Sequence, residues 1–198
     1  NFEIRKHLLD YDDVLNEQRT VIYNQRDQLL ADDNLADRVL NNAKDAVEQM
    51  FYSYTHSGRK NQEAAAAALN EEIRNTFGIQ LPPERLTEDA LLAALQNDIT
   101  EKETLAGKEN LNMFIRYQYV QIIDKKWLDQ LEALESLREA VSLRSYGSKN
   151  PLTEYKIDGF NMFDEMMDTI RSTVMSRVFK VRIQLSPQAA EQRRQAAM

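Results

Sequence analysis

The chain has 198 residues and a formal net charge of −7, with 29% charged and 42% hydrophobic residues, which is ordinary for a soluble globular protein. It holds only 5 Gly and 4 Pro, and alternating strand patterns are scarce, so we predict an all-α fold. The absence of Cys excludes a disulfide framework and a thiolate metal site, and it fits a reducing compartment. The longest uninterrupted apolar runs, residues 64–69 and 90–95, are six residues each, too short to span a bilayer.

Acidic residues concentrate in the middle of the chain. Residues 31–112 contain 8 basic and 15 acidic side chains and therefore carry a net charge of −7. Because binding to phosphates requires a basic face, we do not expect general nucleic-acid binding. The N-terminus lacks an initiator Met and mixes charged with apolar residues, so it does not read as a signal peptide, and we expect the chain to be part of a longer protein.

Residues 1–54 form the first predicted unit, a long scaffold helix. Leu8, Leu15, Ile22 and Leu29 are spaced by seven, and polar Gln18 interrupts the accompanying row. The pattern favours a scaffold helix packed along other helices over a self-associating coiled coil, which needs cleaner heptads. Residues 31–34 indicate a break, at which Asp33 or Asn34 would cap a second helix. That second helix is expected to bury six residues: Leu35, Val39, Ala43, Val47, Met50 and Tyr54.

Residues 55–107 are predicted to be a small, acidic helical insert. A helix over residues 62–77 would close at Gly78, and the Pro pair at positions 82 and 83 forces an extended turn. Thr87 would cap a short helix, and Gly107 marks the end of the insert. After residue 185 the chain is polar, so we expect residues 186–198 to be a flexible tail.

Residues 108–185 predict two long helices folded back on each other as an antiparallel hairpin. No Gly or Pro occurs over residues 108–146, and Gly147 and Pro151 then mark a loop and a new helix start. Gly159 lies within the second arm and indicates a close helix approach or a bend. Trp127 and the methionines at 162, 166 and 167 have helical spacing that favours helix packing over a binding surface. The first arm's apolar stripe comprises Leu111, Phe114, Ile115, Ile122, Ile123, Trp127, Leu131, Leu134, Leu137 and Val141; the second comprises Leu152, Tyr155, Met162, Phe163, Met166, Ile170, Val174, Val178 and Val181.

The residues supply little catalytic or metal chemistry. The Gly107-Lys108 pair lacks both the upstream Gly and the following Ser or Thr of a phosphate-binding loop. His7 and His56 are the only histidines, and neither has metal-ligand spacing. We therefore predict no catalytic residue, no metal and no cofactor in this chain.

The predicted hairpin loop is chemically distinct. Arg144, Tyr146, Lys149 and Asn150 gather at a turn far from any core. An aromatic ring flanked by cations suits contact with an extended polypeptide of varied sequence, since the ring offers apolar area and the cations meet carbonyls or acidic groups. The alternative is that Tyr146 folds back and caps the hairpin. The residues alone favour neither.

Two blocks of the sequence resemble the SecA family of preprotein-translocating motors. The resemblance is to the start of the family's helical scaffold and to its two-helix finger, in the right order and at about the right separation. The insert resembles the helical wing only in position and acidity. The scaffold block is Asn1 to Lys6, Leu8-Leu9, Tyr11 to Val14, Asn16, Gln18-Arg19 and Ile22-Tyr23; the finger block is Ile123 to Trp127, Leu131, Leu137-Arg138, Leu143-Arg144, Tyr146, Pro151, Glu154 to Lys156, Phe160, Met162-Phe163 and Met166.

The resemblance implies a function as the scaffold and finger module of a motor that couples ATP hydrolysis to pushing secretory proteins through the SecY channel. Tyr146, with Arg144 and Lys149, would then contact the unfolded preprotein. The family often has Gly before this tyrosine, whereas this chain has Ser145, which bears on the conformation of the loop. ATP and Mg would bind in nucleotide-binding domains outside this chain, so this part would not itself be an enzyme.

The same resemblance implies the remaining partners and the location. Partners would be the nucleotide-binding and preprotein cross-linking domains of the parent, the SecY channel and, peripherally, an anionic membrane surface. The location would be the bacterial cytoplasm and the cytoplasmic face of the inner membrane. A stand-alone helical adaptor or oligomerisation scaffold is the alternative function. We also expect self-association as a homodimer through residues 1–30, because that face would lose its partner domains.

Overall fold

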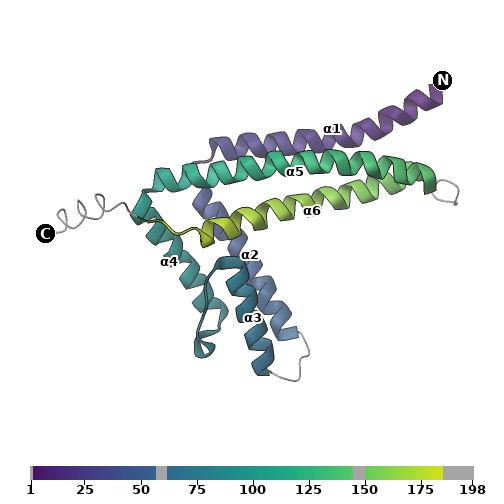
Figure 1. Cartoon of the computed structure of the whole chain (residues 1–198). Coiled ribbons are helices and arrows are strands. Elements are labelled where there is room, and N and C mark those ends of the chain that lie inside the picture. The colour runs from purple at the N-terminus through teal and green to yellow at the C-terminus, as the bar shows by residue number, and fades with distance from the viewer. Residues whose placement is uncertain (1, 57–61, 145–149, 185–198) are drawn as a thin grey trace. The chain divides into compact units, whose positions relative to one another are not determined.

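The computed structural model describes residues 2–56, 62–144 and 150–184, with the backbone alone at residues 2–9 and at 144. Within these ranges the chain is helical and contains no strand, which confirms the all-α prediction. Figure 1 shows the elements in chain order. They are α1 (Phe2–Ala31), α2 (Leu35–His56), α3 (Gln62–Phe77), a 3-10 turn η1 (Pro83–Arg85), α4 (Glu88–Ala106), α5 (Lys108–Arg144) and α6 (Pro151–Lys180).

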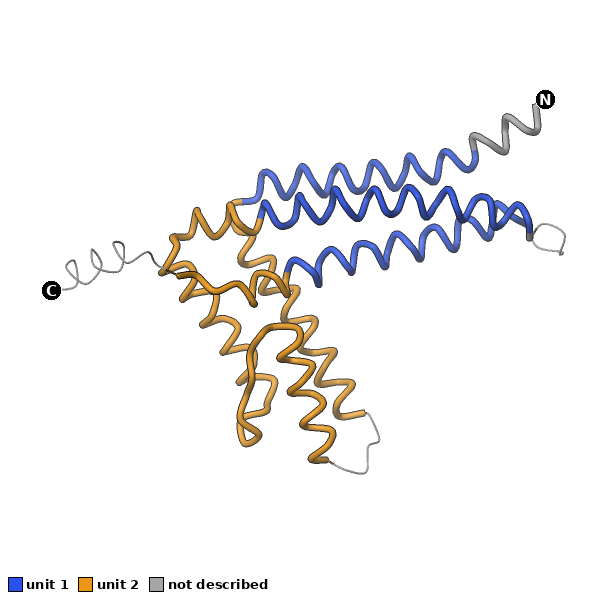
Figure 2. Tube along the Cα trace, viewed as in Figure 1, with its two compact units in different colours: residues 1–32, 116–174 blue, residues 33–115, 175–198 orange. Residues whose placement is uncertain are grey.

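The chain divides into two compact units, coloured separately in Figure 2. Unit 1 contains residues 1–32 and 116–174, and unit 2 contains residues 33–115 and 175–198. The long helices α5 and α6 contribute to both units, because each is continuous across the residue at which the division falls. The sequence instead predicted boundaries by expected function, after residues 54, 107 and 185. The two units reflect packing and do not test these boundaries, which stay a prediction.

Unit 1 is built from α1, the α5 residues from 116 onward and the α6 residues up to 174. The heptad positions Ile22 and Leu29 of α1 are buried, so the predicted seam is occupied within the chain. The stripes of the two hairpin arms are also largely buried, as their spacing of three and four predicts. Buried members in this unit are Ile122, Ile123, Trp127, Leu134, Leu137 and Val141 in α5 and Tyr155, Met166, Ile170 and Val174 in α6, whereas Leu131, Leu152, Met162 and Phe163 are partly buried.

The end of α1 is closed by a side chain from far along the sequence. Arg116 Nη2 donates to the carbonyl oxygen of Asp32 at 3.0 Å, and its Nε donates to that of Leu29 at 3.5 Å. The last carbonyls of a helix lack intrahelical partners and carry partial negative charge, so a cation stabilises them. This contact helps to end α1 at the break predicted over residues 31–34, which the structure confirms.

Unit 2 is built around α2, which packs against both α3 and α4. The buried residues predicted for the second helix are confirmed except Tyr54, which is only partly buried. The helix capped by Thr87 is not short: α4 spans 19 residues, because neither Gly nor Pro occurs between Thr87 and Gly107 to end it. Thr87 Oγ1 accepts a hydrogen bond from the Ala90 N–H at 3.3 Å, as an N-cap does.

Two glycines in unit 2 lie at helix ends and adopt a backbone conformation that other residues rarely adopt. Gly78 and Gly107 have φ values of +69° and +90°, a region that favours glycine. The first N–H of α2, at Leu35, is satisfied by the side-chain oxygen of Asn112 at 2.8 Å. Asn112 lies in α5, so a residue distant in sequence supplies a cap that spacing alone does not predict.

Candidate functional site: the helical hairpin and its support

The predicted polypeptide-contacting residues lie at the end of the hairpin that the structure does not describe in full. Arg144 is the last residue of α5, but its side chain, together with Tyr146 and Lys149, lies outside the described residues. The fourth residue of the predicted cluster, Asn150, has a local role. Its side-chain oxygen accepts from the Leu152 N–H at 3.0 Å and its carbonyl from the Glu154 N–H at 3.2 Å, so Asn150 starts α6 as an N-cap.

Below this loop, the hairpin is packed against α1 by an apolar cluster. The cluster's buried members are Leu134, Leu137, Val141 and Tyr155, and the partly buried residues against it are Tyr11, Val14, Leu15 and Met162. The rings of Tyr11 and Tyr155 meet edge to face with centroids 4.7 Å apart, a favoured aromatic geometry. Packing of this kind extends from the middle of the hairpin to Val141, one turn before the end of α5.

Tyr155 is 3% exposed, and its surroundings shift its acid–base behaviour. Burial raises the pKa of its phenol above the ordinary 10.0, with the nearby Arg138 acting in the opposite direction. The guanidinium of Arg138 lies 5.6 Å from the Tyr11 ring centroid, as a cation–π pair. The two tyrosines and the arginine thus join all three helices of unit 1 near the loop.

A buried polar layer crosses the same three helices farther from the loop. Gln18 of α1 donates through Nε2 to the carbonyl oxygen of Gly159 in α6 at 3.0 Å. Its side-chain oxygen accepts from Nε2 of Gln130 in α5, also at 3.0 Å. Gln18 and Gln130 are 7% and 4% exposed. Buried polar groups that pair in this way favour one register of the helices, because sliding any helix would leave an amide unpaired.

Gly159 lies at the crossing point, which confirms the expected close helix approach. A Cβ atom there would lie 3.3 Å from Leu134 Cδ2 and 3.8 Å from both Gln18 Nε2 and Val14 Cγ1. The missing side chain therefore lets α1 and α5 approach α6 and exposes its carbonyl oxygen to Gln18. The sequence singled out Gln18 as a polar residue in an apolar row and Gly159 as a glycine inside a helix. It did not predict that the two residues are in contact.

The outer face of α1 and α5 carries a groove that the sequence analysis missed. It has a volume of about 490 Å³ and is lined by Tyr23, Arg26, Asp27, Asp124, Trp127 and Leu128. Tyr23 and Leu128 are 52% and 62% exposed, and Arg26 pairs with Asp124 at 3.3 Å. Trp127 is buried as predicted, but it also borders this groove. A groove that combines apolar and aromatic side chains with charged ones suits a protein partner.

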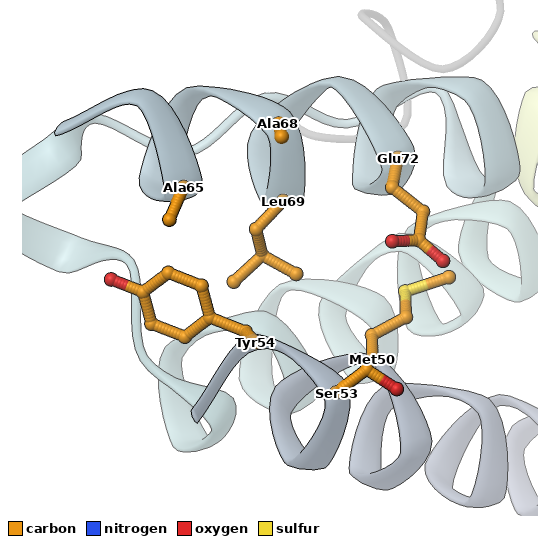
Figure 3. A pocket seen from close by; sticks show the side chains of 7 residues that line it. All are labelled: Met50, Ser53, Tyr54, Ala65, Ala68, Leu69 and Glu72. Carbon is orange, nitrogen blue, oxygen red and sulfur yellow. The ribbon is translucent and has the colours of Figure 1, made fainter. Parts of the chain in front are cut away.

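The described residues show no arrangement suited to a nucleotide phosphate or a metal. The Gly107 N–H already donates to the Glu103 carbonyl oxygen at 2.9 Å, so it does not contribute to a phosphate cradle. No group of three or more His, Asp or Glu side chains in the described ranges is placed to hold a metal ion. A hollow of about 100 Å³ lies between α2 and α3 and is smaller than typical cofactor sites. Figure 3 shows the residues that line it: Met50, Ser53, Tyr54, Ala65, Ala68, Leu69 and Glu72.

Membrane crossing is a separate question. Among the helices of the described ranges, none combines the length and the apolar character needed to cross a bilayer.

Comparison with known proteins identifies the family. The family model described as SecA Wing and Scaffold domain matches residues 1–182. Proteins named Protein translocase subunit SecA from Treponema denticola and Treponema pallidum are 48% and 43% identical to the chain, covering 96% and 95% of it and 22% of each relative. The corresponding protein of Borreliella burgdorferi is 40% identical, covering 92% of the chain and 21% of the relative. The chain thus spans about a fifth of the length of these curated relatives, and it belongs to the SecA wing and scaffold domain family.

Proposed function

We propose that this chain is the scaffold and finger module of a bacterial protein-translocation motor. In this proposal the α5–α6 hairpin presents its loop to an unfolded preprotein at the SecY channel, and α1 holds the hairpin in place. Tyr146, Arg144 and Lys149 make the contact, for the reason given by their chemistry: a ring for apolar contact and cations for carbonyl and acidic groups. The relatives' name, Protein translocase subunit SecA, supports a role in protein transport.

The observation that carries the proposal is the support of the hairpin. The cluster around Tyr155 and the Gln18 layer fix α5 and α6 to α1 along unit 1. A loop that pushes a polypeptide must be mounted on rigid elements, because a force applied at its tip would otherwise bend the arms.

The groove on α1 and α5 is proposed to receive other domains of the parent motor. Its exposed Tyr23 and Leu128 would be buried against the nucleotide-binding or preprotein cross-linking domain. ATP and Mg act in the nucleotide-binding domains, and this module contributes by position alone. The motor would work in the cytoplasm and at the cytoplasmic face of the inner membrane, where an anionic surface is a peripheral partner.

The test is a photo-crosslink from position 146 in the full-length parent, during ATP-driven transport of a stalled secretory chain. We expect adducts to the secretory chain that depend on the channel. Phe160 is the matched control position, because it is an aromatic residue of the same hairpin and 65% exposed. Adducts at position 160 but not at 146, or adducts only within the motor, would contradict the proposed contact and leave Tyr146 as a cap of the hairpin.

The adaptor function remains the second candidate because α1 exposes Val21, Tyr23 and Leu30 at 45%, 52% and 43%. Tyr23 and Leu30 are seven positions apart on one face of α1, and this face, not the buried heptad seam, would mediate a homodimer of the isolated chain. Sedimentation of the wild type and of Tyr23→Ser with Leu30→Ser tests this. A concentration-dependent dimer that the double variant abolishes would support self-association through this face, and a monomer at high concentration would contradict it.

A further inference from the structure

A buried lysine from α4 holds the C-terminal end of α6. Lys102 is 4% exposed, and its ammonium donates to the carbonyl oxygens of Val178 at 2.8 Å and Phe179 at 2.9 Å. It also donates to the carboxylate of Asp98, one turn earlier in α4. An ammonium has three donors, and all three are used here. All four residues belong to unit 2.

A cation is favourable at the C-terminal end of a helix, and Lys102 occupies that position at α6. The last carbonyls of α6 have no intrahelical partners and carry the negative end of the helix dipole. Lysine is seldom buried unless it is paired, and here the partners are two carbonyls and a carboxylate. Burial lowers the pKa of Lys102, while the hydrogen bond and charge of Asp98 oppose that shift. Asp98 thus acts in favour of the charged form of Lys102, and burial acts against it.

The same helix end is enclosed by further specific contacts. Phe179 is fully buried and meets Phe77 of α3 edge to face, with centroids 5.4 Å apart. Arg182, just after α6, donates to the Phe179 carbonyl oxygen at 2.8 Å and to the Gly78 carbonyl oxygen at 3.3 Å. Arg182 also lies 3.6 Å from the Asp98 carboxylate. Two cations therefore approach the end of one helix, and Asp98 balances both.

The pairing with the carbonyls depends on the axial position of α6. Sliding a helix by one turn moves its atoms about 5.4 Å, which would carry the last carbonyls out of reach of the ammonium. The apolar stripe Leu91, Leu95 and Ile99 of α4 is buried and continues to position 102. An apolar side chain there could fill the space, but it would not select one axial position.

We propose that Lys102 is a latch through which α4 fixes the axial position of the C-terminal end of α6. Figure 2 shows the last turn of α6 in the colour of unit 2, while its residues up to 174 belong to unit 1. Lys102 is thus a positioning residue: it acts on the residues of α6 that belong to unit 2. That Lys102 holds the end of α6 does not depend on the proposed function. Only the consequence of this contact for transport rests on that function.

Amide hydrogen exchange of the 198-residue chain tests the latch. In Lys102→Met we expect exchange at residues 178–182 to accelerate about tenfold or more, because charge-assisted hydrogen bonds that close the helix end are lost. Exchange at residues 155–170 should stay unchanged. Lys44→Met is the matched control, since Lys44 is an exposed lysine of α2 in the same unit. A folded Lys102→Met protein with wild-type exchange at residues 178–182 would overturn the proposal.

A second variant covers the case in which Lys102→Met unfolds unit 2 as a whole. Lys102→Arg keeps a cation with several donors at the position, and we expect it to retain most of the protection at residues 178–182. If Lys102→Arg exchanges there as fast as Lys102→Met, or unfolds unit 2 as well, then side-chain shape and not charge holds the helix end, and the latch is rejected.

The consequence for the motor is tested in the full-length parent. We expect Lys102→Met, compared with Lys44→Met, to reduce the length of secretory chain transported per ATP while crosslinks from position 146 persist. Wild-type adducts with equal transport by the two variants would reject a role of the latch in transport. Absence of adducts in the wild type would instead reject the proposed contact, and the exchange result would still decide the latch.

Discussion

The two units bury polar side chains in different ways. In unit 1 the buried polar layer is neutral: Gln18 and Gln130 share one hydrogen bond, and Gln18 adds a second to the carbonyl oxygen of Gly159. In unit 2 the buried polar centre is charged: Lys102 donates to Asp98 and to two carbonyls of α6. Both centres connect helices that are far apart in the sequence.

The difference follows from what the neighbouring backbone leaves unpaired. The layer in unit 1 lies in the middle of three helices, where backbone groups are already bonded within each helix, so a neutral amide suffices. The centre in unit 2 lies at the end of a helix, where carbonyls are unpaired and negative, so a cation fits. Arg116 at the end of α1 follows the same rule. The comparison teaches that the kind of buried polar residue depends on its position along its partner helix.

The largest expected effect is at Lys102. Lys102→Met should lower the free energy of unfolding of unit 2 by about 3 kcal/mol, because it removes the buried partner of the Asp98 carboxylate and leaves the Val178 and Phe179 carbonyl oxygens without their donor. Denaturant unfolding followed by exchange in unit 2 measures it, with Lys44→Met as control. Adding Asp98→Asn to Lys102→Met should recover part of the loss. A double variant less stable than the sum of the two single changes would contradict the pairing.

The neutral layer should be weaker. Gln18→Ala should lower the free energy of unfolding of unit 1 by about 2 kcal/mol, since the buried amide of Gln130 loses its acceptor. Gln28→Ala is the matched control: the same residue type in α1, but exposed, with an expected change of less than about 0.5 kcal/mol. Chemical denaturation of the three proteins gives the difference. If Gln18→Ala lowers the free energy of unfolding more than Lys102→Met does, the expected order of the two buried polar centres is wrong.

Gly159 should respond less, because two effects oppose each other. Gly159→Ala gains about 1 kcal/mol of helix propensity but brings a Cβ to 3.3 Å from Leu134 Cδ2, so the net change should stay within about 1 kcal/mol. Gly159→Leu should destabilise clearly more, since a large side chain cannot fit at this crossing. Thermal unfolding of both variants measures this, and a Leu variant as stable as the Ala variant would show that the helices are not closely packed there.

The smallest effect at neutral pH is expected for Tyr155→Phe, which keeps the ring. The folded protein raises the pKa of Tyr155 above 10.0, so its folded state disfavours the phenolate. The associated stability is present below pH 10 and is lost as pH rises through the folded pKa. The free energy of unfolding of the wild type should therefore fall more steeply above pH 10 than that of Tyr155→Phe. Tyr23→Phe, at an exposed tyrosine, should follow the wild type.

Much of the fold could be predicted from local pattern. The break before Leu35, the Thr87 cap and the positive φ values of Gly78 and Gly107 each follow from residues adjacent in sequence. The length of α4 was wrongly predicted, because a capping signal marks where a helix starts but not where it ends. The hairpin loop was singled out by its composition, and the roles of Tyr146, Arg144 and Lys149 stay predictions.

By itself, the sequence determined the all-α class and where most helices begin, because periodicity and capping residues are properties of neighbouring positions, and its identity to known proteins determined the family. Only the tertiary structure decided which polar residues meet: Gln18 with Gly159, Asn112 with Leu35, and Lys102 with the end of α6. These pairs are separated by 141, 77 and 77 positions. A stripe position can show that Lys102 faces inward, but its partner is set by how the helices pack, which no local pattern records.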